Sequence, residues 1–117
     1  MRIFLICPVR NITDEEKIAI ERYVSDLELA GQIVHWPLRD TDQNDPIGFR
    51  ICEDNRRAIE LADEVHVWWN AASKGSFFDF GMTFALGKKI VLANIASLVR
   101  TPEKSFENVL LAVAVRE

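Results

Sequence analysis

The sequence predicts an α/β fold, a single-domain three-layer sandwich of the Rossmann or flavodoxin type with a parallel sheet of four to five strands. Short apolar runs alternate along the chain with longer segments of helical periodicity, an order typical of repeated βαβ units. The apolar runs are continuous, as expected for strands covered on both faces. A length of 117 residues suits one unit, so we assign residues 1–117 to a single domain.

The first half of the chain supplies two strands and one helix. Arg2–Cys7 is the clearest strand, because six residues in succession are almost entirely apolar. A capping box of Thr13 and Glu16 predicts the start of a helix, and Gly31 predicts its end. The apolar segment Gln32–Pro37 is expected to be the second strand.

The middle of the chain supplies the second helix and the third strand. Leu38–Asp45 is polar and acidic and is expected to be a loop. Asp45 followed by Pro46 predicts a helix N-cap with proline in the first helical position, and the helix is expected to run to about Ala62. Glu64–Trp69 is then expected to be a strand.

The last third of the chain repeats the pattern. Asn70–Gly75 is a small, polar loop, and the apolar segment Ser76–Leu86 has helical periodicity. Gly87 predicts the end of that helix. Lys89–Ala93 is expected to be the fourth strand and Pro102–Val115 the final helix.

Composition limits the partners. The net charge of −4 argues against a nucleic-acid polymer, because proteins that bind one usually present a basic surface. No apolar run reaches the roughly 18–20 residues that a membrane helix needs, and the apolar start is too short for a signal peptide. Two cysteines form no disulfide framework, so we expect a cytoplasmic protein with no membrane partner.

No cofactor or metal is expected. The sequence contains neither a GxGxxG nor a GxxxxGK[ST] motif, so the dinucleotide and P-loop fingerprints are missing. The two histidines and two cysteines lack the spacing of zinc ligands.

The loop before the third helix is the best candidate for binding an anion. In sheets of this type, ligands bind beyond the carboxyl ends of the strands. Ser73, Lys74, Gly75 and Ser76 precede or open a helix, where free N–H groups favour phosphate. Arg10 follows the first strand and offers a planar fork of donors to the same anion. The alternatives are that Ser76 is only an N-cap and that Arg10 is simply solvated.

Three further residues are candidates with open alternatives. Asp79 lies among phenylalanines, which indicates either a nucleophile or acid–base group, or a carboxylate that stabilises its own helix start. Asp63 closes a helix at its negative end, which indicates a turn hydrogen bond or a role in the site. Trp36 is able to stack on a planar base, although an aromatic residue at a strand end is more often part of the core.

These pieces together resemble the nucleoside 2-deoxyribosyltransferase-like family, which includes the 2′-deoxynucleoside 5′-phosphate N-hydrolases. The resemblance rests on Ala62-Asp63, a strand, Ser73-Lys74-Gly75, then Asp79-Phe80-Gly81 and Ala85-Leu86 before the next strand. It implies cleavage or transfer of an N-glycosidic bond through a carboxylate nucleophile that forms a covalent sugar intermediate.

The resemblance also implies roles for individual residues. Asp79 falls on the nucleophile position, and Asp63 on a second acid of the active site. Arg10, Ser73 and Gly75 fall on phosphate-binding positions, and the Gly75-Ser76 amides are expected to assist them. The substrate is then a nucleoside or nucleotide, and the family implies a homodimer or a higher homo-oligomer.

One departure keeps a second hypothesis open. The family has Glu where this chain has Asp79, and the shorter side chain withdraws its carboxylate by about 1 Å, which can cost on the order of 100-fold in rate. The alternative to an enzyme is therefore a non-catalytic module that binds or senses a nucleotide on the same fold.

Overall fold

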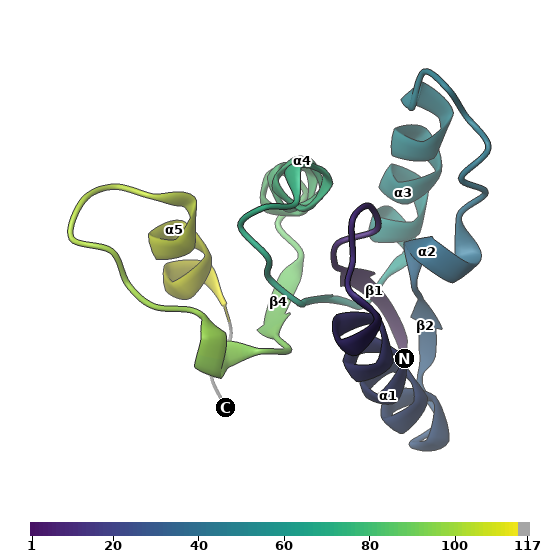
Figure 1. The fold of residues 1–117 in the computed structure, drawn as a ribbon, viewed down its shortest axis with the longest axis horizontal. Helices are drawn as coiled ribbons and strands as arrows, with labels where there is room; N and C mark the ends of the chain where they lie inside the picture. Colours follow the sequence, from purple (N-terminus) through teal and green to yellow (C-terminus); the bar gives the residue numbers. More distant parts are fainter. Residues whose placement is uncertain (115–117) are drawn as a thin grey trace.

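The structure, a computed structural model, describes residues 1–114 and contains a four-stranded, entirely parallel sheet (Figure 1). The strands are β1 (Arg2–Ile6), β2 (Ile33–His35), β3 (Glu64–Val67) and β4 (Lys89–Leu92). Their spatial order is β2-β1-β3-β4, which is the order of flavodoxin-like sheets. The strand order therefore reverses at the β1/β3 boundary: β2 is added on one side of β1, and β3 and β4 are added on the other. Such folds bind their ligands at this switch point.

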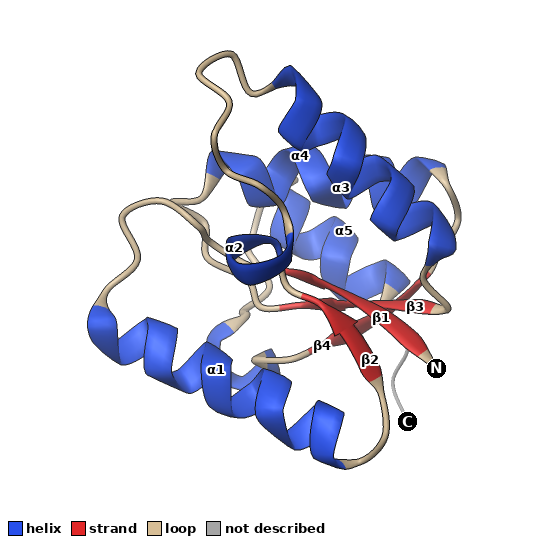
Figure 2. Cartoon of the chain, turned by 90° about the vertical axis from the view of Figure 1, so that its right-hand side faces the viewer, coloured by secondary structure: helices blue, strands red, loops and turns tan. Residues whose placement is uncertain are grey.

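Helices cover both faces of the sheet, which confirms the predicted three layers (Figure 2). On one face lies α1 (Asp14–Leu29). On the other lie α3 (Phe49–Leu61), α4 (Lys74–Ala85) and α5 (Phe106–Val113). Within residues 1–114, no helix is both long enough and apolar enough to cross a bilayer.

Alternate residues of β1 enter two separate cores. Leu5 packs with Ile20 of α1, whereas Phe4 packs in the cluster that contains Ile59 of α3 and Leu110 of α5. All five of these side chains are completely buried. Because successive strand residues point to opposite faces and both faces are covered, the strand is a continuous apolar run.

The start and end of α1 follow the sequence signals. Thr13 accepts a hydrogen bond from the Glu16 amide at 3.1 Å, and Gly31 has a φ of +91° beyond the helix end. The Glu16 carboxylate does not accept a hydrogen bond from the Thr13 amide, as a complete capping box requires. It accepts hydrogen bonds from Trp68 Nε1 and Asn70 Nδ2, each at 3.3 Å, so only half of the capping box forms.

The predicted start of the second long helix is wrong by three residues. The helix α3 begins at Phe49, and its N-cap is Gly48 with a φ of +89°. Asp45 still serves the helix, because its carboxylate accepts the Arg50 amide at 2.9 Å. Pro46 lies outside the helix, in the bend that carries the chain from Asp45 to Gly48.

A short helix replaces the end of the second predicted strand. The strand β2 stops at His35, and α2 (Pro37–Asp40) follows within the segment expected to be strand end and loop. Asp40 accepts a hydrogen bond from the Trp36 amide at 2.8 Å, which turns the backbone out of the sheet direction.

The last two helices also have shifted boundaries. The helix α4 begins at Lys74 rather than Ser76, and α5 begins at Phe106 rather than Pro102 because Ser105 caps it. A 3-10 turn over Ile95–Ser97 was not expected. The predicted end of the final helix at 115 lies outside the described residues.

Candidate active site

A cavity of about 510 Å³ opens at the carboxyl edge of the sheet, beside the β1/β3 boundary. Its walls come from the segments that follow β1 and β2, the loop between β3 and α4, and the N-terminal halves of α3 and α4. The lining side chains that matter for its chemistry are Cys7, Arg10, Cys52, Asn55, Ser73, Lys74, Gly75, Phe78 and Asp79. The predicted location of a ligand site is therefore matched by a cavity large enough for a small molecule.

Asp79 is the buried carboxylate of this cavity. Its side chain lines the cavity although the residue is only 9% exposed. Its carboxylate oxygens accept no hydrogen bond from any residue among 1–114, and Thr83 bonds only to its backbone carbonyl. Burial raises the pKa of Asp79 to about 7. Of the two opposing effects that the sequence suggested, only desolvation acts, because Asp79 is the sixth residue of α4 and accepts no hydrogen bond from the N–H groups of the first turn.

Helical spacing explains how Asp79 reaches the cavity. Gly75, Phe78 and Asp79 are three and four residues apart, so they share one face of α4. Phe77 points elsewhere, and its ring packs on Trp69 with centroids 4.7 Å apart. Only Phe78 of the phenylalanine pair lines the cavity, and it is 55% exposed.

The N-terminus of α4 presents donors to the same cavity. Lys74 and Gly75 belong to the first turn, where a helix offers their N–H groups no acceptor. Ser76 differs from the expectation: it is fully buried, and its amide and hydroxyl both donate to Ser73 Oγ, at 3.3 and 2.9 Å. Ser73 is therefore the N-cap, and Ser76 supports the loop without lining the cavity.

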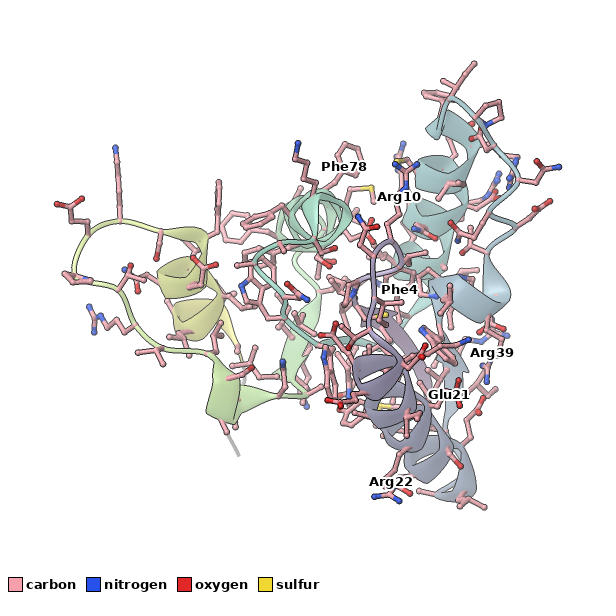
Figure 3. All side chains as sticks on the ribbon, viewed as in Figure 1. Phe4, Arg10, Glu21, Arg22, Arg39 and Phe78 are labelled. Atoms are coloured by element: carbon pink, nitrogen blue, oxygen red, sulfur yellow. The ribbon has the colours of Figure 1, made fainter. Side chains whose placement is uncertain are left out.

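Arg10 adds an exposed positive charge to the cavity. It lies in the loop that joins β1 to α1, and its side chain rises between α4 and α3 on the side of Phe78 (Figure 3). The adjoining Asn11 has a φ of +53°, a left-handed conformation that asparagine tolerates better than most residues. The turn at Asn11 thus directly follows Arg10, before the chain enters α1 at Asp14.

Asn55 is a site residue that the sequence analysis missed. It is 6% exposed, and it lies one turn after Ile51 and Cys52 on the cavity face of α3. Thr41 donates a hydrogen bond to Asn55 Oδ1 at 2.7 Å, and Thr41 Oγ1 lies 2.8 Å from His35 Nε2. The sequence feature that could have identified Asn55 is its uncharged amide on the apolar face of an amphipathic helix.

Burial disfavours the thiolate form of both cysteines that line the cavity. Burial, with smaller contributions from the charges of Asp79 and Glu16, raises the pKa of Cys7 to about 12. Burial and Asp79 also raise the pKa of Cys52. A thiolate nucleophile is thereby disfavoured, which leaves Asp79 as the nucleophile candidate of the cavity.

The structure does not bring Asp63 or Trp36 to the cavity. Asp63 lies at the opposite edge of the sheet, where its carboxylate accepts the Arg2 amide at 2.7 Å. The reason is topological, since a residue that precedes a parallel strand lies at the amino edge. Trp36 points to the α1 side of the sheet with Val34 and packs in that core at 6% exposure. Of the two roles expected for Trp36, stacking on a base and packing in the core, the structure favours packing in the core.

Comparison with known proteins extends these observations. Neither a protein-family model nor a curated protein matches the sequence. Among solved structures, the CMP N-glycosidase BcmB of Clostridium botulinum has a TM-score of 0.66 at 21% identity, over 97% of this chain and 83% of that one. The 2-deoxyribosyltransferase of Bacillus psychrosaccharolyticus has a TM-score of 0.66 at 15% identity, over 99% and 98%.

The chain has the deoxyribosyltransferase fold. The resemblance that the sequence indicated is thus confirmed in the fold, with a parallel sheet and helices on both faces. The two structural neighbours act on N-glycosidic bonds or transfer deoxyribosyl groups, according to their names. Within the deoxyribosyltransferase fold, this chain places one buried carboxylate, one arginine loop and one helix N-terminus around a single cavity.

Proposed function

We propose that the protein cleaves or transfers the N-glycosidic bond of 2′-deoxynucleosides or their 5′-monophosphates, with Asp79 as the nucleophile. The observation that carries the proposal is the Asp79 carboxylate, buried beside the cavity and without a hydrogen-bond partner among residues 1–114. A carboxylate with such surroundings is costly for the fold, so a functional role accounts for it better than a structural one.

The reaction follows from the chemistry of a carboxylate nucleophile. An Asp79 oxygen attacks C1′ of the sugar, the C1′–N bond breaks, and its electron pair leaves with the base. Water then attacks C1′ of the ester, releases the sugar with its new hydroxyl, and restores the Asp79 carboxylate as a proton passes to solvent. A second base that attacks in place of water gives transfer instead of hydrolysis.

The donors at one end of the cavity support a 5′-phosphate on the substrate. Arg10 and Lys74 are the cationic side chains that line the cavity within residues 1–114. Ser73 and the first-turn amides of Lys74 and Gly75 lie at the same end, where the dipole of α4 is positive. A methyl group on Gly75 would meet no atom within 4 Å, so the backbone there is open to a ligand.

A non-catalytic nucleotide-binding module remains the second candidate. The observation that favours it is that Asp79 is the only carboxylate lining the cavity within residues 1–114, whereas retaining glycosidases use two. This candidate predicts that nucleotides raise the melting temperature without release of base.

A homodimer is the expected assembly, and it remains a prediction. Ile47, Phe49 and Phe78 are between 55% and 87% exposed in the single chain, at or near the α3 end that opens on the cavity. Exposed apolar side chains of this size are often covered by a partner. Multi-angle light scattering of the purified chain tests this expectation: a mass near 13.4 kDa would contradict it, and twice that mass would support it.

Release of free base tests the proposed reaction. The protein is incubated with a panel of deoxynucleosides and deoxynucleoside 5′-monophosphates, with and without an acceptor base, and free base is measured by HPLC. We expect Asp79→Asn to abolish release, and Asp26→Asn, an exposed α1 variant, to leave it unchanged. Release that persists in Asp79→Asn would rule out the nucleophile. Thermal stabilisation without any release would favour the binding module.

A further inference from the structure

Apart from Asp79, no carboxyl group among residues 1–114 lines the cavity. Its titratable lining residues within 1–114 are Cys7, Arg10, Cys52, Lys74 and Asp79. If Asp79 is the nucleophile, no second carboxyl group lines the cavity, and Asp63 lies at the other edge of the sheet. The retaining scheme needs a group at the leaving base, and glycosidases normally use a carboxylic acid there.

Asn55 lines the cavity, and one hydrogen bond holds the oxygen of its amide. The Thr41 hydroxyl has one proton, which it donates to Asn55 Oδ1 at 2.7 Å. The 2.8 Å contact with His35 must then run from Nε2–H to Thr41 Oγ1. This chain of two hydrogen bonds fixes the amide, and Nδ2 has no partner among the described residues. Asn55 and Thr41 are 6% and 4% exposed, so the arrangement is built into the interior.

The wall that holds Asn55 suits a nucleobase. The α3 residues on the cavity are Gly48, Ile51, Cys52 and Asn55, none of which is charged at neutral pH, and Phe78 of α4 is exposed beside them. The cationic residues come instead from the β1–α1 loop and the start of α4. A planar base against α3 and a phosphate at α4 would place the sugar at Asp79 between them.

We propose that Asn55 donates a hydrogen bond from Nδ2 to the departing base and takes the place of a general acid, an assignment that rests on the proposed function. As the C1′–N bond breaks, its electron pair goes to the base, which leaves as an anion held by Asn55 and then takes a proton from solvent water. Thr41 and His35 are positioning residues. A fixed donor at developing negative charge is typically worth 100- to 1,000-fold in kcat.

Several groups surround Asp79 and bear on any pH profile. Cys7 at the end of β1, Cys52 on α3, Arg10 in the β1–α1 loop and Lys74 at the start of α4 line the cavity with Asp79. The charge of Glu16 on α1 acts on Cys7. Asn55 and Thr41 do not titrate, and burial lowers the pKa of His35, which keeps it neutral near pH 7. The proposed reaction therefore needs an ionised Asp79 carboxylate and no protonated acid among the described residues.

The wild-type protein tests the absence of an acid. We expect kcat/KM for base release to rise through about pH 7 and to stay level to about pH 9. We also expect the rate to fall steeply across a series of substrates as the pKa of the released base rises. A descending limb that solvent and substrate titration do not explain would overturn the proposal, because it would reveal a protein acid.

Matched variants test Asn55 itself. Asn55→Leu has similar volume without a donor, and we expect kcat to fall 100- to 1,000-fold while KM changes less than threefold. Asn55→Asp introduces a carboxyl group, and we expect it to add a descending limb to the pH profile. Thr41→Val should lower kcat by about tenfold or more, and Thr41→Ser, which keeps the hydroxyl, should restore it. Circular dichroism checks the fold of each variant.

The outcomes separate this assignment from the proposed function. Base release that depends on Asp79 but keeps its kcat within threefold in Asn55→Leu would overturn the role of Asn55 alone. If Asn55→Leu fails to fold, equal rates in Thr41→Val and Thr41→Ser would overturn it. A wild-type protein that releases no base from any substrate would overturn both proposals together.

Discussion

Asp63 and Asp79 lie at opposite edges of one parallel sheet. Asp63 precedes β3 and bonds to the Arg2 amide at 2.7 Å, whereas Asp79 lies on the helix that follows β3 and lines the cavity at the carboxyl ends. The strand between them separates two carboxylates that a sequence pattern places in one active site. This separation leaves Asp79 as the one carboxylate among residues 1–114 that lines the cavity, and it gives Asp63 a structural contact.

Asp63→Ala should affect stability rather than catalysis. The variant removes an exposed acceptor of one backbone hydrogen bond, and we expect the free energy of unfolding to fall by about 0.5–1.5 kcal/mol. Base release should stay within twofold of the wild-type rate. Urea unfolding and the HPLC assay measure the two quantities. A large loss of kcat at unchanged stability would return Asp63 to the catalytic machinery.

Asp79→Asn should stabilise the fold at neutral and higher pH. Because the folded-state pKa of about 7 lies above the ordinary value of 3.8, the folded state binds the proton more tightly, and wild-type stability falls as the pH rises from about 4 to 7. Asparagine does not ionise, so the variant does not lose this stability. We expect its free energy of unfolding to exceed that of the wild type by on the order of 1–4 kcal/mol at pH 8 and by little at pH 4. Urea unfolding at both pH values tests the sign. An equal effect at the two would contradict a raised pKa.

Arg10→Gln should discriminate between nucleotides and nucleosides. If Arg10 pairs with a 5′-phosphate, its loss should raise KM for monophosphates by roughly tenfold or more and leave KM for nucleosides unchanged. Arg22→Gln is the matched control, because Arg22 is an exposed arginine of α1 that points away from the cavity (Figure 3). An equal effect of the two variants would indicate a general charge effect instead of a contact.

Cys52 should report occupancy of the cavity. It is half-buried in the cavity wall and its pKa is raised, so we expect slow alkylation by N-ethylmaleimide that accelerates with pH. A bound nucleotide should slow the labelling by several-fold. Cys52→Ser identifies the labelled site in the mass spectrum, since Cys7 is buried. Unchanged labelling with ligand at a concentration that stabilises the protein would place the ligand elsewhere.

The sequence predicted the main elements because their signals are local. The apolar run of Arg2–Ile6 and the Thr13 cap each depend on neighbouring residues, and both formed as expected. The start of α3 was predicted wrongly. Gly48 takes a left-handed conformation and is the N-cap, while Asp45, three residues earlier, accepts the Arg50 amide. The sequence pattern around Asp45 is the same whether this residue is the N-cap itself or bonds to the helix from beyond a bend, so the pattern alone does not fix the start of α3.

The sequence by itself determined the alternation of strands and helices, the choice of the loop before α4 as the candidate anion site and the choice of Asp79 as the unusual carboxylate. Those features follow from periodicity, capping and a charge placed among aromatic residues, all of which are readable along the chain. Only the tertiary structure decided which of these residues share a cavity. It brought in Asn55 from a different helix and left out Asp63, because the distance between side chains depends on strand direction and on the packing of helices over the sheet.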